Sequence, residues 1–134
     1  MKRILFLIAV VISFISCGGN TSPQQATSPA TRSDVTEVLY FHGKQRCITC
    51  NAIEQLTREV VDSLANDKVV MKIIDISRKE NEAIADRYEI TWSSLILDRN
   101  GKTENLTDMG FSYAKGQPEL FKDKLIEAIQ NISK

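Results

Sequence analysis

The sequence predicts an α/β domain over residues 34–134, in which strands and helices alternate along the chain. The segment Val35–His42 contains the unbroken apolar run VLYF, which is typical of a strand covered on both faces. Between residues 50 and 66, apolar residues recur at steps of three and four among charged ones, and this spacing predicts an amphipathic helix. The full order expected is strand, helix, strand, helix, strand, strand, helix.

Three further segments continue this order. KVVMKIIDI, residues 68–76, is expected to be the second strand. Ser77 and Glu80 have the spacing of a capping box, so a short helix should follow and end near Tyr88. SLILD, residues 94–98, is expected to be the third strand.

The remaining elements have clear boundaries in the sequence. Asn100-Gly101 predicts a tight turn, and the polar segment 102–107 predicts a partner strand at the sheet edge. Gly110, like Gly101, is expected in a turn. Pro118 suits the first position of a helix, because it has no N–H to leave unbonded there. The last helix then presents one apolar stripe, formed by Phe121, Leu125, Ala128, Ile129 and Ile132.

Residues 1–16 predict a signal peptide. Lys2 and Arg3 precede the apolar run ILFLIAVVISFIS, which is too short to span a bilayer comfortably and has the length of a signal-peptide core. A buried core helix is the alternative.

Cys17 follows this run, and FISCGGN resembles the lipobox of bacterial lipoproteins. Ser16 fits the small residue before the cysteine, whereas Phe14 replaces the usual leucine. The resemblance implies that Cys17 receives a lipid and becomes the N-terminus; an ordinary cleaved secretory signal is the alternative. Residues 17–33 carry two prolines and no large apolar residue, so they are expected to form a flexible tether.

Cysteine count and charge narrow the classes of function. If Cys17 is lipidated, only Cys47 and Cys50 remain of the three cysteines, and an exported compartment would allow them to form a disulfide. Without residues 1–16 the chain has 15 Lys and Arg against 17 Asp and Glu, a formal charge of −2. This balance argues against a nucleic-acid partner. No glycine-rich phosphate loop is present, so no organic cofactor is expected.

A CxxC pair between the first strand and the first helix, in this order of elements, resembles the thioredoxin fold. The resemblance covers residues 34–134 and includes the turn at Asn100-Gly101 and Gly110 before the last helix. It implies a central mixed sheet with helices on both faces. Two segments, LYFHGKQRCITCNAIEQL and ITWSSLIL, look most like small bacterial lipoproteins described as nitrophenyl compound nitroreductase subunits.

Cys47 and Cys50 are the candidate catalytic residues. A cysteine at a helix N-terminus lies beside unpaired backbone N–H groups and the positive end of the helix dipole, which both stabilise a thiolate. Lys44 and Arg46 add positive charge, and no carboxylate lies between His42 and Cys50. We therefore expect a lowered pKa for Cys47, which would attack disulfides, while Cys50 resolves the mixed disulfide. The thioredoxin resemblance implies the same two roles.

Two other roles for the pair stay open. An inert disulfide would close so small a loop that it would stabilise the chain little. Alternatively, the two thiolates bind a soft ion such as Cu(I) or As(III), with His42 as a third ligand. His42 could also hydrogen-bond a thiolate or shuttle a proton, or it could simply face solvent at the end of the strand.

The sequence departs from the thioredoxin pattern beside the pair. Arg46 stands where a tryptophan usually precedes the first cysteine, and the first strand holds no aspartate. The cis-proline of the facing loop is absent; Ser93 aligns with it, and Trp92 precedes Ser93. A cis bond there would cost about 2.5–4 kcal/mol, so we expect a trans bond and a more open site. Trp92 is expected either as a wall of the site or as a core residue.

Together these features predict a periplasmic, lipid-anchored protein that exchanges a disulfide with a partner protein. A soft-metal carrier that uses the same cysteines, and a non-catalytic accessory subunit of a reductase, are the alternatives. The predicted site consists of Cys47 and Cys50, supported by Arg46, His42, Trp92 and Ser93.

Overall fold

The computed structural model describes residues 34–134, so the predicted signal peptide, Cys17 and the tether lie outside the described residues. Strands and helices alternate through most of this part of the chain. Its elements are β1 (Thr36–His42), α1 (Ile48–Leu64), β2 (Val69–Asp75), the 3₁₀ helix η1 (Lys79–Asn81), α2 (Glu82–Arg87), β3 (Ser94–Arg99), β4 (Lys102–Asn105), α3 (Thr107–Tyr113) and α4 (Pro118–Ile132).

The sheet has four strands in the order β2-β1-β3-β4. β1 runs parallel to β2 and antiparallel to β3, and β3 runs antiparallel to β4, so the sheet is mixed as predicted. β1 lies in the interior of the sheet, and Tyr40 at its centre is paired with Ile73 on one side and Leu95 on the other. The unbroken apolar run in β1 is explained by this position, since both faces of the strand are covered.

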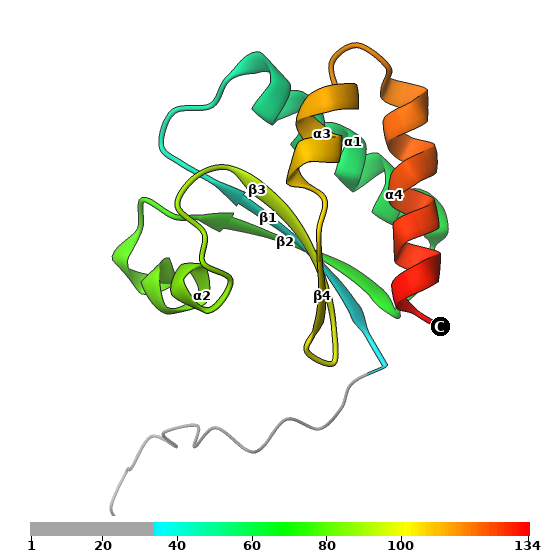
Figure 1. Ribbon diagram of the computed structural model, residues 1–134, viewed down its shortest axis with the longest axis horizontal. Coiled ribbons are helices and arrows are strands. Elements are labelled where there is room, and N and C mark those ends of the chain that lie inside the picture. The colour runs from blue at the N-terminus through cyan, green and yellow to red at the C-terminus, as the bar shows by residue number, and fades with distance from the viewer. Residues whose placement is uncertain (1–33) are drawn as a thin grey trace, which may run out of the picture.

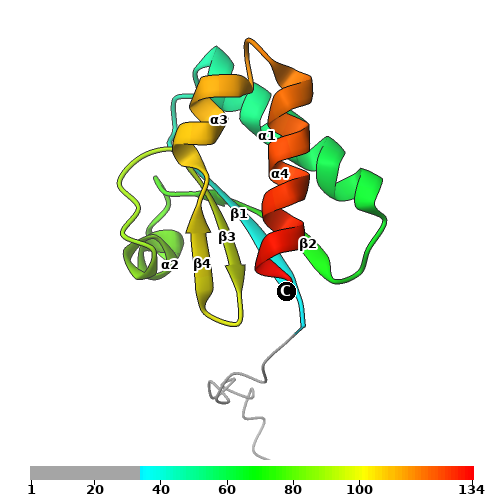
Figure 2. The same cartoon turned by 45° about the vertical axis from the view of Figure 1, so that its right-hand side comes forward.

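Helices cover both faces of the sheet, but unequally (Figure 1). α1, α3 and α4 lie on one face, and their core includes Val38, Tyr40 and the fully buried Phe121. α2 lies on the opposite face, beside a small core of Leu39, Phe41, Ile74 and Ile96. Alternate residues of β1 therefore serve different cores, and Figure 2 shows the two layers from another side.

The predicted order of elements is confirmed, with one helix added. The polar strand β4 ends at Asn105, and α3 follows it before α4. The Oδ1 atom of Asn105 accepts the Thr107 N–H at 2.9 Å, which turns the chain into the helix. Gly110 lies inside α3 and not in a turn, because it packs against α1: a Cβ atom there would lie 3.2 Å from Ile53 Cδ1.

The predicted capping box at Ser77 and Glu80 is wrong. The Ser77 hydroxyl donates to Asp75 Oδ1 at 2.6 Å, and its backbone N–H donates to the same oxygen at 2.9 Å. Ser77 therefore closes a turn at the end of β2, and does not cap a helix. Arg78 holds the N-cap position of η1 without a side-chain hydrogen bond, and α2 begins only at Glu82.

The predicted turn and the start of the last helix are confirmed. Asn100 and Gly101 have φ values of 55° and 84°, the left-handed conformation that a tight hairpin turn requires. The Gly101 N–H donates to Asp98 Oδ1 at 2.9 Å and fixes the turn. α4 begins at Pro118 and buries its apolar stripe. Within residues 34–134, none of the helices combines the length and apolar character needed to cross a bilayer.

Candidate active site

Cys47 is the N-cap of α1, and the helix begins at Ile48, two residues before the predicted start. Its Sγ atom accepts the backbone N–H of Cys50 at 3.1 Å. A sulfur here takes the place of the serine, threonine or aspartate oxygen that usually satisfies a free N–H at a helix start. The first turn of α1 contains no acidic residue. This surrounding favours a negative charge on Cys47 Sγ when the pair is reduced.

Cys47 and Cys50 are joined in a disulfide, and their Cα atoms are 5.0 Å apart. The two residues differ in access: Cys47 is exposed, whereas only 6% of Cys50 is. A thiolate from outside can thus approach the Cys47 sulfur much more easily than that of Cys50. The division between an attacking Cys47 and a resolving Cys50 stays a prediction, and this difference in access favours it.

Tyr40 lies beneath the pair and was not predicted as a site residue. It is fully buried in β1, and its hydroxyl donates to the backbone carbonyl of Cys50 at 2.8 Å. Burial raises the pKa of Tyr40 to about 12, while the Arg46 charge and the Ser93 side chain act in the opposite direction. The phenol is therefore a neutral donor at ordinary pH. The buried group under the second cysteine is thus a tyrosine of β1, a strand that lacks the aspartate of the thioredoxin pattern.

Arg46 does not act as a free positive charge beside Cys47. Its guanidinium forms an ion pair with the Glu54 carboxylate, which also pairs with Arg58 at 3.0 Å. Glu54 follows Cys50 by one helical turn, so the helix brings it to the site although the local sequence around the cysteines lacks a carboxylate. The four-residue step from Cys50 to Glu54 along the predicted helix is the feature of the sequence that indicates this proximity.

His42 is buried, with 8% of its surface exposed, so the alternative in which it simply faces solvent is wrong. Its Nδ1 atom lies 2.9 Å from the Gly43 carbonyl oxygen. Because that oxygen can only accept, Nδ1 carries a proton, and Nε2 is the ring nitrogen that does not take part in this contact. Within residues 34–134, no group of three or more His, Cys, Asp or Glu side chains is arranged to hold a metal ion. The three-ligand site of Cys47, Cys50 and His42 is therefore not assembled in this structure.

Ser93 and Trp92 lie in the loop before β3. No peptide bond among the described residues is cis, so the bond before Ser93 is trans as expected. Ser93 reaches the Tyr40 hydroxyl closely enough to influence its pKa, which places it near the pair. Trp92 is 53% exposed and stacks on Phe111 of α3 with 5.2 Å between ring centroids. Trp92 is thus not a core residue, and its role as a wall of the site stays a prediction.

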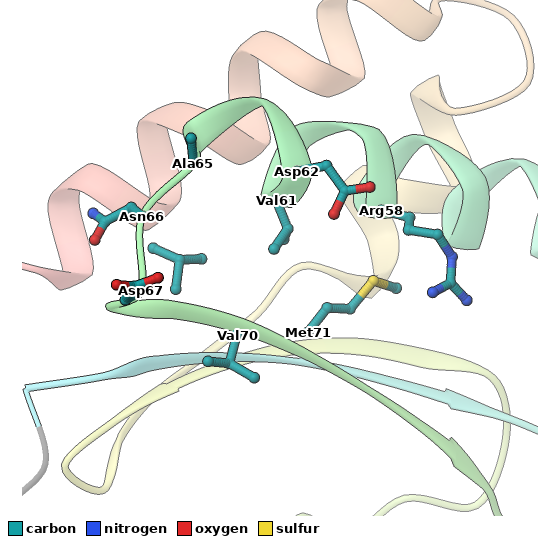
Figure 3. A pocket seen from close by; sticks show the side chains of 9 residues that line it. Arg58, Val61, Asp62, Ala65, Asn66, Asp67, Val70 and Met71 are labelled. Carbon is teal, nitrogen blue, oxygen red and sulfur yellow. The ribbon is translucent and has the colours of Figure 1, made fainter.

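A hollow of about 530 Å³ lies at the opposite end of α1 (Figure 3). Side chains from the last turns of the helix, including Arg58 and Val61, line it together with Val70 and Met71 of β2. Cys47 and Cys50 belong to the first turn of the same helix, so this hollow is separate from the redox pair.

The sheet, the covering helices and the CxxC pair at the start of α1 define a thioredoxin-like fold. Among solved structures, the chain is similar to Trxlp from Edwardsiella tarda, with 18% identity and a TM-score of 0.53 over 70% of this chain and 84% of that one. It is also similar to human ERp44, with 20% identity and a TM-score of 0.53. This match covers 77% of this chain but only 29% of the ERp44 chain. The sequence matches no protein-family model and no curated protein. The comparisons thus support the predicted fold and lend no support to the nitroreductase resemblance.

Proposed function

We propose that this protein exchanges a disulfide with a partner protein outside the cytoplasm, through Cys47 and Cys50. The observation that carries the proposal is the contrast between the two sulfurs. One belongs to an exposed residue at a helix N-terminus, and the other belongs to a buried residue one turn further. A disulfide that served only to stabilise the chain would have no need of this contrast, and a loop this small would stabilise it little.

The exchange follows from the disulfide state. A thiolate of the partner attacks Cys47 Sγ, a bond between the two proteins forms, and the Cys47–Cys50 bond breaks. Cys50 leaves as a thiolate and takes up a proton. A second thiol of the partner then attacks the partner's own sulfur in the mixed disulfide, which releases Cys47 as a thiolate. The Cys50 N–H, already 3.1 Å from this sulfur, stabilises the released charge. The partner leaves oxidised, and the reverse sequence reduces a partner disulfide.

The N-terminal sequence supports a location at the cell envelope, facing the periplasm. A signal peptide of residues 1–16 would direct export, and a lipid on Cys17 would hold the chain at a membrane. Residues 17–33 would then connect the lipid to the domain and could extend at most about 60 Å. The first residue of the domain would then lie within that distance of the membrane surface.

Trapping tests the proposal directly. In the cells that produce the protein, Cys50→Ser should accumulate a mixed disulfide with the partner, because the resolving thiol is missing. Cys47→Ser is the matched control and should trap nothing. Failure of Cys50→Ser to trap any protein would contradict the proposal. A Cys47→Ser variant that keeps both partner association and cellular function would instead indicate a non-catalytic accessory subunit.

A redox titration of the purified protein gives a second, independent test. A reversible two-electron transition between about −120 and −300 mV is expected for a working exchange protein. A pair that stays oxidised far below this range would be structural, and the proposal would fail.

A further inference from the structure

A crevice lies where the loops after β1 and β2 separate, and Arg46, the residue before Cys47, is part of its lining. The two strands are parallel, and their last residues, His42 and Asp75, are neighbours. The chain leaves β1 toward α1 on one face of the sheet and leaves β2 toward α2 on the other face (Figure 1). The carboxyl ends of parallel strands whose loops part in this way are where open α/β sheets bind ligands.

The crevice has a volume of about 470 Å³, which suits a small molecule. Its walls are polar and carry both signs of charge, with two guanidinium groups and two carboxylates. The lining side chains include His42, Arg46, Asp75, Arg78, Glu80 and Asn81.

The charged groups of the β2 loop are accessible to a ligand. Arg78 lies 3.6 Å from the Asp75 carboxylate and 3.4 Å from that of Glu80, and both Arg78 and Glu80 are exposed. Such exposed pairs contribute little, so a charged ligand can replace them at low cost. Hydrogen bonds from Ser77 lower the pKa of Asp75, which therefore remains a carboxylate. The Asn81 amide donates to the Asp75 carbonyl at 2.9 Å and holds the loop in place.

His42 adds the imidazole ring of a buried residue to the lining of the crevice. The residue is 8% exposed, and its Nδ1–H donates to the Gly43 carbonyl. Within the described part of the chain, no hydrogen bond to Nε2 is formed. This nitrogen can accept a hydrogen bond from an ammonium or thiol group of a molecule in the crevice.

From this arrangement we infer that the crevice binds small thiols of the amino-acid or short-peptide type, which carry both a carboxylate and an ammonium group. The inference rests on the proposed function and names a second class of substrate for the same pair. The carboxylate pairs with Arg78, and the ammonium group pairs with Glu80. Arg46 lines the crevice and directly precedes Cys47 in the chain, and on this inference the ligand sulfur reaches the exposed cysteine from the Arg46 side.

The reaction consumes two small thiols. The thiolate of the first attacks Cys47 Sγ, a bond between Cys47 and the ligand forms, and the Cys47–Cys50 bond breaks. Cys50 leaves as a thiolate and takes up a proton. The thiolate of the second ligand attacks the bound ligand sulfur, and Cys47 leaves with its electron pair. The products are one small disulfide and the reduced pair, so two electrons pass from the ligands to the protein.

Four thiols of similar size test the inference on the oxidised full chain, purified in detergent. Cysteine carries both charged groups, 3-mercaptopropionate carries only the carboxylate, cysteamine carries only the ammonium group, and 2-mercaptoethanol carries neither. Reduction is quenched by alkylation, read by mass and expressed per thiolate. We expect saturation with cysteine and a rate at low concentration up to about 25-fold above that of 2-mercaptoethanol, since each exposed ion pair adds at most about fivefold. The two singly charged thiols should fall between them.

Substitutions of crevice residues test whether the preference for cysteine arises there. Arg78→Gln and Glu80→Gln should each lower the ratio of the cysteine rate to the 2-mercaptoethanol rate, by up to about fivefold. Lys79→Gln, a charge change in the same loop at a residue that does not line the crevice, should leave this ratio unchanged. Equal rates for all four thiols, or a ratio insensitive to Arg78 and Glu80, would overturn the inference. That result together with a trapped partner would leave the proposed function intact, whereas a pair that no thiol reduces would contradict both.

Discussion

Replacing Tyr40 with phenylalanine removes the hydroxyl group that lies beneath the redox pair. This hydroxyl donates to the Cys50 carbonyl at 2.8 Å in a site without solvent. The carbonyl belongs to the first turn of α1 and keeps its helical N–H partner in the variant. The variant should therefore lose the net value of one hydrogen bond, about 1 kcal/mol of the free energy of unfolding, and not the larger cost of an unpaired buried group.

The loss of stability in Tyr40→Phe should also depend on pH. Burial raises the pKa of Tyr40 to about 12, above the ordinary value of 10 that applies in the unfolded chain. The stabilisation is thus complete below pH 10 and declines as pH rises from 10 toward 12, because the unfolded chain releases the phenolic proton first. Tyr40→Phe lacks this decline, so the difference between the two proteins should shrink above pH 10.

Urea unfolding followed by circular dichroism at pH 7 and pH 11 measures both effects. Tyr113→Phe is the matched control, because the half-buried Tyr113 makes no hydrogen bond through its hydroxyl within the described residues and should change by less than about 0.5 kcal/mol. Equal midpoints for Tyr40→Phe and the unchanged protein at pH 7 would refute the assigned hydrogen bond. A difference that stays constant up to pH 11 would refute the raised pKa.

Three further changes test other parts of the structure. Thr57→Val should raise the free energy of unfolding by about 1 kcal/mol, measured in urea, because the buried Thr57 hydroxyl has no hydrogen-bond partner among residues 34–134. A loss of stability would contradict this. Gly101→Ala should cost about 1–2 kcal/mol because of its φ of 84°, whereas Gly116→Ala, at an open site, should cost little. Glu54→Gln should lower the pKa of the reduced Cys47 thiol, since the neighbouring guanidinium groups lose their counter-charge. The pH profile of alkylation measures this, and an unchanged profile would count against it.

The parts of the fold that the sequence predicted are those whose burial follows a local pattern. The apolar run of β1 and the stripe of α4 appear in the sequence as they do in the core. α3, with the sequence TDMGFSY, has no such pattern. Its Gly110 packs against Ile53 of α1, a residue far away in the sequence. Ser77 illustrates a related limit. It stands three residues before Glu80, as in a capping box, but its hydroxyl donates to the nearer Asp75 carboxylate instead.

The residues of the candidate site likewise fall into those that a local sequence pattern predicts and those that only the fold brings together. Cys47 and Cys50 could be identified from their spacing and from the strand before them, because a helix start stabilises a thiolate whatever its sequence. Tyr40 and Glu54 could not, since their roles depend on where a buried strand and a helix turn place them. The charge of Arg46 was read correctly from the sequence, but its pairing with Glu54 is visible only in three dimensions.

The unequal cores on the two faces of the sheet have a consequence for local opening. Fifteen buried side chains form the core under α1, α3 and α4, whereas four form the core beside α2. Segments that bury little apolar surface open at a fraction of the free energy of global unfolding. Residues 79–87 should therefore exchange their amide protons well before α1 and α4 do. The wall of the crevice that carries Glu80 can then yield to molecules of different size while the first turn of α1, with both sulfurs, keeps its shape.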